Sequence, residues 1–181
     1  MNLLLRLLLT ILRSVRRPRI HPLASSSVPF RVLPNDLDIN LHMNNGRYLA
    51  VMDLARLDLM ARFGLLGEVR RRRWMPVVGA LTIRYRRPLD PFDGYRVDTR
   101  MLCWDEKWFY LEQRFVRQGS VVSIAFVKGL FQSPGGPVPP ADIVRTAGFE
   151  IASPPMPEAV SLWQRSEAAM LETPPHAEVE A

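Results

Sequence analysis

The sequence predicts an α+β fold in which an antiparallel sheet of about five strands wraps around one long central helix. Residues 46–66 carry apolar side chains at helical spacing on two faces, which is typical of a helix enclosed by the rest of the protein. From residue 81 onward the apolar period changes to two, the period of strands. Short links between these strands indicate that sequence neighbours pair as a meander.

The elements are expected in a simple order. Residues 28–33 form a short strand that Pro34 ends, and a turn-rich stretch leads to the helix. Asn44 or Asn45 caps this helix, and Gly64 or Gly67 stops it. Four strands follow, near residues 81–85, 95–103, 107–117 and 121–132, with a turn at Gln118-Gly119 before the last. The loop 134–140 ends the sheet, and a last helix is expected within residues 158–171.

A chain of 181 residues suits one globular domain. We place an amphipathic segment and linker at residues 1–24, the domain at 25–150, and a C-terminal helix with a disordered tail at 151–181. One cysteine, Cys103, excludes an internal disulfide, and its apolar strand neighbours favour a buried thiol over a nucleophile. The three histidines are too widely separated for a local metal cluster, so we expect no metal and no cofactor.

The net charge of +6 favours polyanionic partners, namely an acidic membrane surface or a small molecule that bears phosphate. No nucleic-acid motif with its required spacing is present, and we expect no nucleic-acid partner. The basic run at residues 70–73 could hold the phosphates of coenzyme A or face lipid, or it could be a solvated surface loop.

Residues 1–17 predict an amphipathic helix with a broad apolar face. Arg6, Thr10, Arg13 and Arg17 align on its narrow polar stripe. The run is too short to span a bilayer, and the positive charge follows the apolar run, unlike in a signal peptide. We interpret it as a helix that lies on an anionic membrane; a helix docked on the body or on a second subunit is the alternative. The protein is accordingly expected in the cytoplasm, with peripheral contact at the inner membrane face.

Residues 36–48 read D-L-D-I-N-L-H-M-N-N-G-R-Y and place polar groups between a strand and a helix start. The unpaired N–H groups that open a helix can bind an anion or oxyanion. If the loop is extended, Asp38, Asn40 and His42, at two-residue steps, point into one cleft and supply the parts of acyl transfer. Asp and Asn are also common cap and turn residues, so a purely structural role is the alternative.

This stretch resembles the signature of the hotdog-fold thioesterases, roughly D-x-D-x-x-x-H-x-N-N-x-x-Y before the central helix, in the 4-hydroxybenzoyl-CoA thioesterase-like superfamily. The sequence is similar in particular to the thioesterase superfamily member six group. With it the chain shares R-V-L-P-x-D-L-D, L-H-M-N-N-x-R-Y-L and W-D-x-x-x-F-Y-L-E-x-R-F-V. The resemblance also covers the hydrophobic N-terminal segment and a C-terminal helix near Trp163. It implies a hotdog fold and hydrolysis of fatty-acyl thioesters carried by coenzyme A or acyl carrier protein.

The resemblance also implies roles for single residues. The second Asp of the signature acts as nucleophile or general base, which carries over to Asp38, with Asn40 and His42 as its catalytic partners. The amide that opens the central helix serves as oxyanion donor, which carries over to Asn45. The expected substrate-binding residues are Asn44, Asn45, Tyr48, Arg86 and Arg87. The two arginines are not taken from the resemblance: with Arg84 they lie on an expected strand and could hold phosphates or face lipid, or be solvated, as the run at residues 70–73 could. Hotdog proteins are usually dimers with the site at the subunit junction, so we expect a homo-oligomer.

The chain departs from related patterns in two places. Many bacterial members have a glycine before the histidine, where Leu41 stands here and is expected to narrow the cleft. Plant acyl-carrier-protein thioesterases, which also have Asp, Asn and His at positions 38, 40 and 42, carry a carboxylate after a Y-R-R triplet; here Pro88 follows Tyr85-Arg86-Arg87.

Two other functions stay open at this point. A hotdog-fold hydratase or dehydratase would carry D-x-N-P-x-H, which is one residue longer than the spacing here and contains a proline. A non-catalytic acyl-thioester or lipid-binding protein at the membrane would keep only the fold and the pocket. The Asn44-Asn45 pair and the shorter spacing favour hydrolysis.

Overall fold

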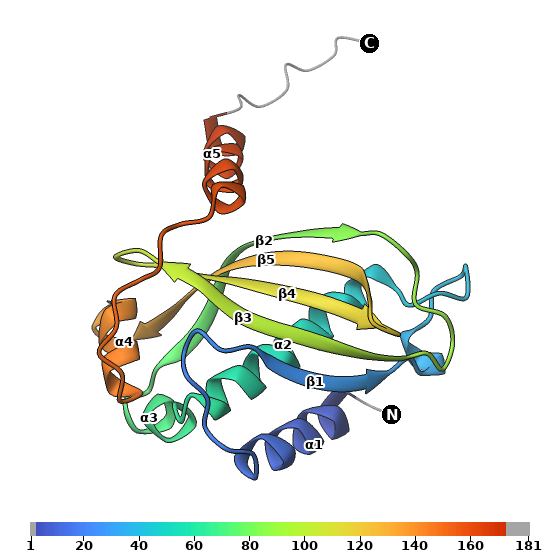
Figure 1. The fold of residues 1–181 in the computed structure, drawn as a ribbon, viewed down its shortest axis with the longest axis horizontal. Coiled ribbons are helices and arrows are strands. Elements are labelled where there is room, and N and C mark those ends of the chain that lie inside the picture. The colour runs from blue at the N-terminus through green and yellow to red at the C-terminus, as the bar shows by residue number, and fades with distance from the viewer. Residues whose placement is uncertain (1–2, 173–181) are drawn as a thin grey trace.

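A computed structural model describes residues 3–172 and arranges them as one curled sheet with helices on its concave side, at one end and on its outer face (Figure 1). The strands are β1 (Ser26–Arg31), β2 (Met75–Tyr85), β3 (Gly94–Trp104), β4 (Phe109–Arg117), β5 (Ser120–Ser133) and β6 (Gly136–Val138). The helices are α1 (Leu3–Val15), α2 (Asn45–Arg62), α3 (Leu66–Arg71), α4 (Pro140–Thr146) and α5 (Glu158–Glu172), and a 3₁₀ turn covers Pro34–Asp36.

The predicted sheet around a central helix is confirmed. Every strand pairing is antiparallel, and the order is β1-β3-β4-β5-β2, with β6 added beside β5. The meander β3-β4-β5 follows from short links, and Gln118 and Gly119 both adopt positive φ in the turn before β5. The strand β2 pairs only with β5 and therefore forms one edge of the sheet.

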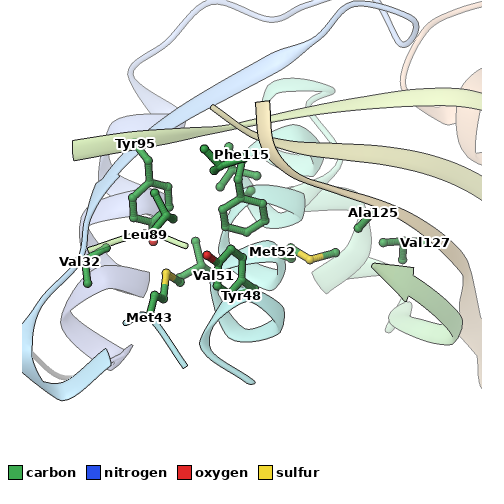
Figure 2. Close-up of a cluster of buried hydrophobic side chains, with 13 residues drawn as sticks. Val32, Met43, Tyr48, Val51, Met52, Leu89, Tyr95, Phe115, Ala125 and Val127 are labelled. Atoms are coloured by element: carbon green, nitrogen blue, oxygen red, sulfur yellow. The ribbon is translucent and has the colours of Figure 1, made fainter. Parts of the chain in front are cut away.

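The concave face of the sheet buries α2 (Figure 2). On the helix, Tyr48, Val51, Met52 and Ala55 supply buried apolar surface at helical spacing. Phe115 of β4 lies against them, with its ring centroid 4.8 Å from that of Tyr48. This packing sets the position of the first turn of α2, where the candidate site begins.

Three elements differ from the sequence expectation. The loop at 134–140 does not end the sheet, because Gly136, at φ 119°, lets the chain fold back as β6. The basic run starts in the last turn of the short helix α3 with Arg70 and Arg71 and continues past its end, and Glu68 pairs with Arg71 and Arg72. Helix α4, which follows β6, was not expected from the proline-rich sequence; it starts at Pro140 and buries Ile143 and Val144.

The ends of the helices agree better with the sequence. Asn44 caps α2, which stops at Arg62, and Gly64 two residues later adopts φ 76°. Helix α5 covers the stretch expected near Trp163, whose ring packs against Phe126 on the outer face of the sheet. The tail expected to be disordered lies from residue 173 on, outside the described residues.

Helix α1 packs on α2 with its polar side inward, which reverses the usual arrangement of an amphipathic helix on a domain. The buried side chains of α1 are those of Arg6, Thr10 and Ser14. The opposite, apolar face of the helix is exposed, including Leu4 and Leu8. Within residues 3–172, no helix combines the length and the apolar character that crossing a bilayer requires.

Candidate functional site

The polar stretch forms a compact loop between Asp36 and Asn44. The Asn44 N–H donates to the Asp36 carbonyl at 2.8 Å and closes the base of the loop. Inside it, the Asp38 N–H donates to the His42 carbonyl at 2.9 Å, and Leu37 pairs with Met43 as an isolated bridge. The loop is therefore not extended, because these backbone hydrogen bonds turn the chain back on itself, and the condition under which Asp38, Asn40 and His42 would all point into one cleft is not met.

Leu41 makes the turn by adopting φ 59°, the left-handed region. Its N–H donates to the Asp38 carbonyl at 3.1 Å. A glycine takes this conformation without steric cost, which gives a physical reason for the glycine that the resemblance leads one to expect there. Leu41 and Ile39, which is 97% exposed, make the tip of the loop apolar and open to solvent.

Replacing Leu41 tests this account of the turn. Leu41→Gly removes the left-handed penalty while its side chain loses little packing, so the free energy of unfolding should rise by about 0.5–1 kcal/mol. Leu41→Val, which is β-branched, should lower it. Urea unfolding of both variants measures the difference. A less stable glycine variant would show that Leu41 makes stabilising contacts that its exposure hides.

Asp38 is partly exposed, and only one of its two carboxylate oxygens makes hydrogen bonds within the described residues. Its Oδ1 accepts from the N–H of Asn40 at 2.9 Å and from the N–H of His42 at 3.4 Å. Within residues 3–172, no hydrogen bond reaches Oδ2. The structural role considered for Asp38 is thus real, but it occupies one oxygen and leaves the other available as a base or nucleophile.

His42 and the two arginines lie at the same end of the molecule as Asp38. The His42 Nε2 is 3.6 Å from Oδ1 of Asp90, and the Met43 N–H donates to the Leu89 carbonyl at 2.9 Å, so residues 86–90 run beside the loop. Arg86 and Arg87 begin this segment with exposed side chains. The structure therefore places the segment that Arg86 and Arg87 begin beside the loop, and their contact with a carrier stays a prediction.

The start of α2 leaves one amide free. The Asn44 side chain accepts from the Gly46 N–H at 2.8 Å, and the Arg47 N–H donates to the Asn44 carbonyl at 2.8 Å. The Asn45 N–H has no acceptor in the part of the chain that the structure describes. Because a helix start is electropositive, this N–H is suited to bind an oxyanion. Tyr85 supports the turn from the sheet, since its hydroxyl donates to the Asn45 carbonyl at 3.2 Å.

Two of the expected site residues, Asn40 and Tyr48, lie in surroundings that differ from each other. The Asn40 N–H is tied to Asp38, and the Asn40 side chain is exposed at the loop surface. Tyr48 is 2% exposed and lies in the core, where burial raises its pKa to about 12 and a backbone hydrogen bond with Leu89 offsets part of that rise. Figure 2 shows Tyr48 between Met43 and Phe115. Its expected contact with substrate stays a prediction.

An apolar cavity of about 390 Å³ lies between α2 and the sheet. It is within the usual range for ligand pockets. Leu54, Leu57 and Met60 of α2 line one side, Val77 and Val78 of β2 another, and α4 closes it with Ile143 and Val144. Sequence reasoning missed this cavity because its walls come from segments far apart in the chain, with no local motif. None of its lining residues belongs to the loop 36–48, so within a single chain the cavity does not include Asp38.

Other candidates are weaker on chemical grounds. Cys103 is buried as expected, and burial together with Asp105 raises its pKa to about 11, which opposes thiolate chemistry. Over residues 3–172, no group of three or more His, Cys, Asp or Glu side chains is placed to hold a metal ion.

Known proteins with similar sequences and folds carry related names. Residues 32–164 match the thioesterase-like superfamily. Protein THEM6 of Xenopus laevis is 38% identical over 135 residues, covering 73% of this chain and 63% of that protein. Protein THEM6 of Danio rerio is 51% identical over 94 residues, covering 52% and 46%. The matches thus cover about half to two thirds of these relatives' length. A solved gentisyl-coenzyme A thioesterase superposes with a TM-score of 0.61 at 24% identity, covering 67% of this chain and 98% of that one.

Proposed function

This chain belongs to the thioesterase-like superfamily and has the expected hotdog fold, and from these premises we propose that it hydrolyses an acyl thioester to a free acid and a thiol. One observation carries the proposal. A single closed loop ends in the unpaired Asn45 N–H at the positive end of α2 and holds Asp38 with one carboxylate oxygen uncommitted. Acyl transfer needs these two groups, a base or nucleophile and an oxyanion donor.

In the proposed mechanism, the thioester carbonyl oxygen accepts from the Asn45 N–H. Oδ2 of Asp38 takes a proton from a water molecule, whose oxygen attacks the carbonyl carbon. Alternatively, Oδ2 attacks that carbon itself and forms a mixed anhydride, which water hydrolyses to the free acid and the Asp38 carboxylate after the thiolate has left. In both routes the C–S bond breaks, and the thiolate leaves with the electron pair; the side chains of His42 and Asn40 can stabilise it. Thiolates leave readily, so an ordinary carboxylate base suffices.

The cavity and the arginines support a fatty-acyl substrate on a phosphate-bearing carrier. A cavity of about 390 Å³ with apolar walls fits an alkyl chain better than a polar acyl group. Arg86 and Arg87 offer guanidinium groups to the phosphates of coenzyme A or of the acyl-carrier-protein arm. The gentisyl-coenzyme A thioesterase, by its name, acts on an aromatic acyl group, so the fold alone does not determine the acyl part.

The test is release of free thiol from a series of acyl-CoAs, from butyryl to stearoyl, and from the same chains on acyl carrier protein. We expect turnover that rises with chain length until the cavity is filled. Enoyl-CoA hydration without thiol release would assign the protein to the hydratases. Tight acyl-CoA binding with no turnover at any length would make it a binding protein instead.

We also propose a homodimer that completes the site through β2. This edge strand is long, and Met75, Val78 and Tyr85 are exposed on it. A long apolar edge strand presents unpaired N–H and C=O groups to which a strand of another chain can add. Pro76, Val77 and Val78 of this strand also line the cavity, so a second β2 paired along it would bring the partner chain to the acyl-binding wall. In this arrangement, the cavity of one chain can lie next to the catalytic loop of the partner chain.

A peripheral membrane contact through residues 1–17 is the second proposal that a specific feature favours. Leu4, Leu5, Leu8, Leu12 and Val15 are exposed on α1. The exposed residues Arg13, Arg16, Arg17 and Arg19 follow or flank them. An apolar helix face bordered by arginines is suited to the interface of an anionic bilayer.

Vesicle sedimentation tests this contact. The full chain should bind phosphatidylcholine vesicles that contain phosphatidylserine more tightly than vesicles that lack it. The double variant Leu8→Ser/Leu12→Ser should weaken partitioning by about tenfold or more, because both side chains lose their burial in lipid. Leu162→Ser, at an equally exposed leucine of α5, is the matched control. Unchanged binding in the double variant, or a change in oligomeric state instead, would contradict a lipid partner.

A further inference from the structure

Helix α1 places a guanidinium group inside the protein, beneath the candidate site loop. Arg6 is 5% exposed, although arginines are rarely buried without a specific partner. Its Nη1 and Nη2 donate to the two carboxylate oxygens of Asp36, at 3.1 and 2.5 Å, and Nη2 also donates to the Arg31 carbonyl. We infer that Arg6 is a positioning residue for the site loop and acts on it through Asp36. The inference rests on the function proposed above.

Asp36 is the residue through which such an effect can travel, because it holds both ends of the loop. Its Oδ2 accepts from the Leu33 N–H at 2.9 Å, before the loop. Its carbonyl accepts from the Asn44 N–H at 2.8 Å, at the cap of α2. Asp38 lies two residues after Asp36, and the free N–H of Asn45 lies one residue after Asn44. A shift of Asp36 therefore moves the acid and the oxyanion donor relative to each other.

The Arg6–Asp36 pair suits this role because of its burial and geometry. Asp36 is 1% exposed, and a two-pronged contact from a planar guanidinium orients a carboxylate better than a single ammonium group does. Arg47 of α2 also approaches, but its Nε is 3.8 Å from Oδ1 of Asp36 and its side chain is partly exposed. Arg6 is thus the main partner of this buried charge.

The same helix offers a matched anchor that does not touch the loop. Near the other end of α1, the buried Ser14 hydroxyl donates to Asp58 of α2 at 2.5 Å. Asp58 also accepts from Ser26 of β1. Loss of Ser14 would loosen α1 on α2, whereas loss of Arg6 would loosen α1 and release Asp36. Comparing variants of Ser14 and of Arg6 therefore distinguishes the attachment of α1 to the domain from the positioning of the site loop.

The experiment compares Arg6→Met, Arg6→Lys and Ser14→Ala in steady-state thiol release. Arg6→Met should lower kcat by about tenfold or more with KM nearly unchanged, because small displacements of catalytic groups are costly. Arg6→Lys should recover part of kcat. Ser14→Ala should keep kcat within about twofold of the wild type, since the hydrogen-bonded loop is untouched. Equal losses of kcat in the Arg6→Met and Ser14→Ala variants would overturn the inference.

Arg6→Met leaves a buried carboxylate unpaired and can destabilise the fold, so a second variant keeps the test informative. Arg6→Met/Asp36→Asn removes both charges, and its amide oxygen can still accept from the Leu33 N–H. It should fold normally but keep the low kcat. A wild-type kcat in this double variant would show that the pair does not position the loop.

Amide hydrogen exchange separates failure of this inference from failure of the proposed function. Exchange of residues 37–44 should accelerate in Arg6→Met/Asp36→Asn and stay unchanged in Ser14→Ala, whether or not the protein hydrolyses thioesters. Loop exchange that is equal in all variants refutes the positioning role. Accelerated exchange in a protein whose wild type turns over no thioester would refute the enzymatic proposal and leave the coupling between α1 and the loop intact.

Discussion

Asp38→Asn is expected to lower thiol release by about 100-fold or more, because an amide neither accepts a proton from water nor attacks a thioester. The substitution keeps the loop intact. The new amide oxygen can still accept from the N–H groups of Asn40 and His42, as Oδ1 of Asp38 does. Steady-state kinetics on the preferred acyl-CoA measures kcat, and binding of the same substrate to the variant measures affinity. We expect kcat to fall and affinity to be kept.

Two comparisons make this result specific. Asp142→Asn removes an exposed carboxylate from α4, remote from the loop in sequence, and should leave kcat unchanged. The thermal midpoint of Asp38→Asn should match that of the wild type, since the loop hydrogen bonds remain. A kcat close to that of the wild type would remove Asp38 from the mechanism and leave it as a turn residue only.

Val78→Lys is expected to convert the proposed dimer into monomers and to abolish most of the activity. Val78 is exposed on the edge strand β2 and also lines the cavity, so a second chain paired there would have to bury the ammonium group. In a twofold dimer the change occurs twice, and the dissociation constant should rise by about 100-fold or more. Analytical ultracentrifugation over a range of concentrations gives the stoichiometry, and thiol release gives the activity.

The controls for Val78→Lys address charge and cavity separately. Leu162→Lys adds the same charge at an exposed position of α5, which is not part of the edge strand, and should leave the oligomeric state and the activity unchanged. Val78→Ile keeps an apolar side chain in the cavity wall and should also stay dimeric. A wild-type protein that sediments as a monomer yet hydrolyses acyl-CoA would reject a site completed by two chains.

The long helix and the strands were predictable from sequence because their signals are local. Apolar spacing on α2, alternation along β3 and the Gln118-Gly119 turn each depend on neighbouring residues. The cap at Asn44 and the left-handed Gly64 after α2 are equally local. Misjudged segments lie where local signals conflict with packing. One is the proline-rich stretch, which nevertheless forms β6 and α4.

The candidate loop could be located but not shaped from its sequence. The motif places Asp38, Asn40 and His42 together in the chain, and the step of two between them would point all three side chains into one cleft only if the loop were extended. Backbone hydrogen bonds across the loop and a left-handed Leu41 decide otherwise. A leucine carries no local signal for that conformation, since its preference is for negative φ.

By itself, the sequence determined the sheet wrapped around α2, the capped helix start and the acid beside it, because each follows from residue types a few positions apart. Only the tertiary structure decided that α1 turns Arg6 inward to Asp36 and its leucines outward. It alone also assembled the apolar cavity against β2 and apart from Asp38. The physical reason is the same in both cases. Burial and charge pairing depend on partners tens of residues away, and the pattern of a single helix or strand does not name its partner.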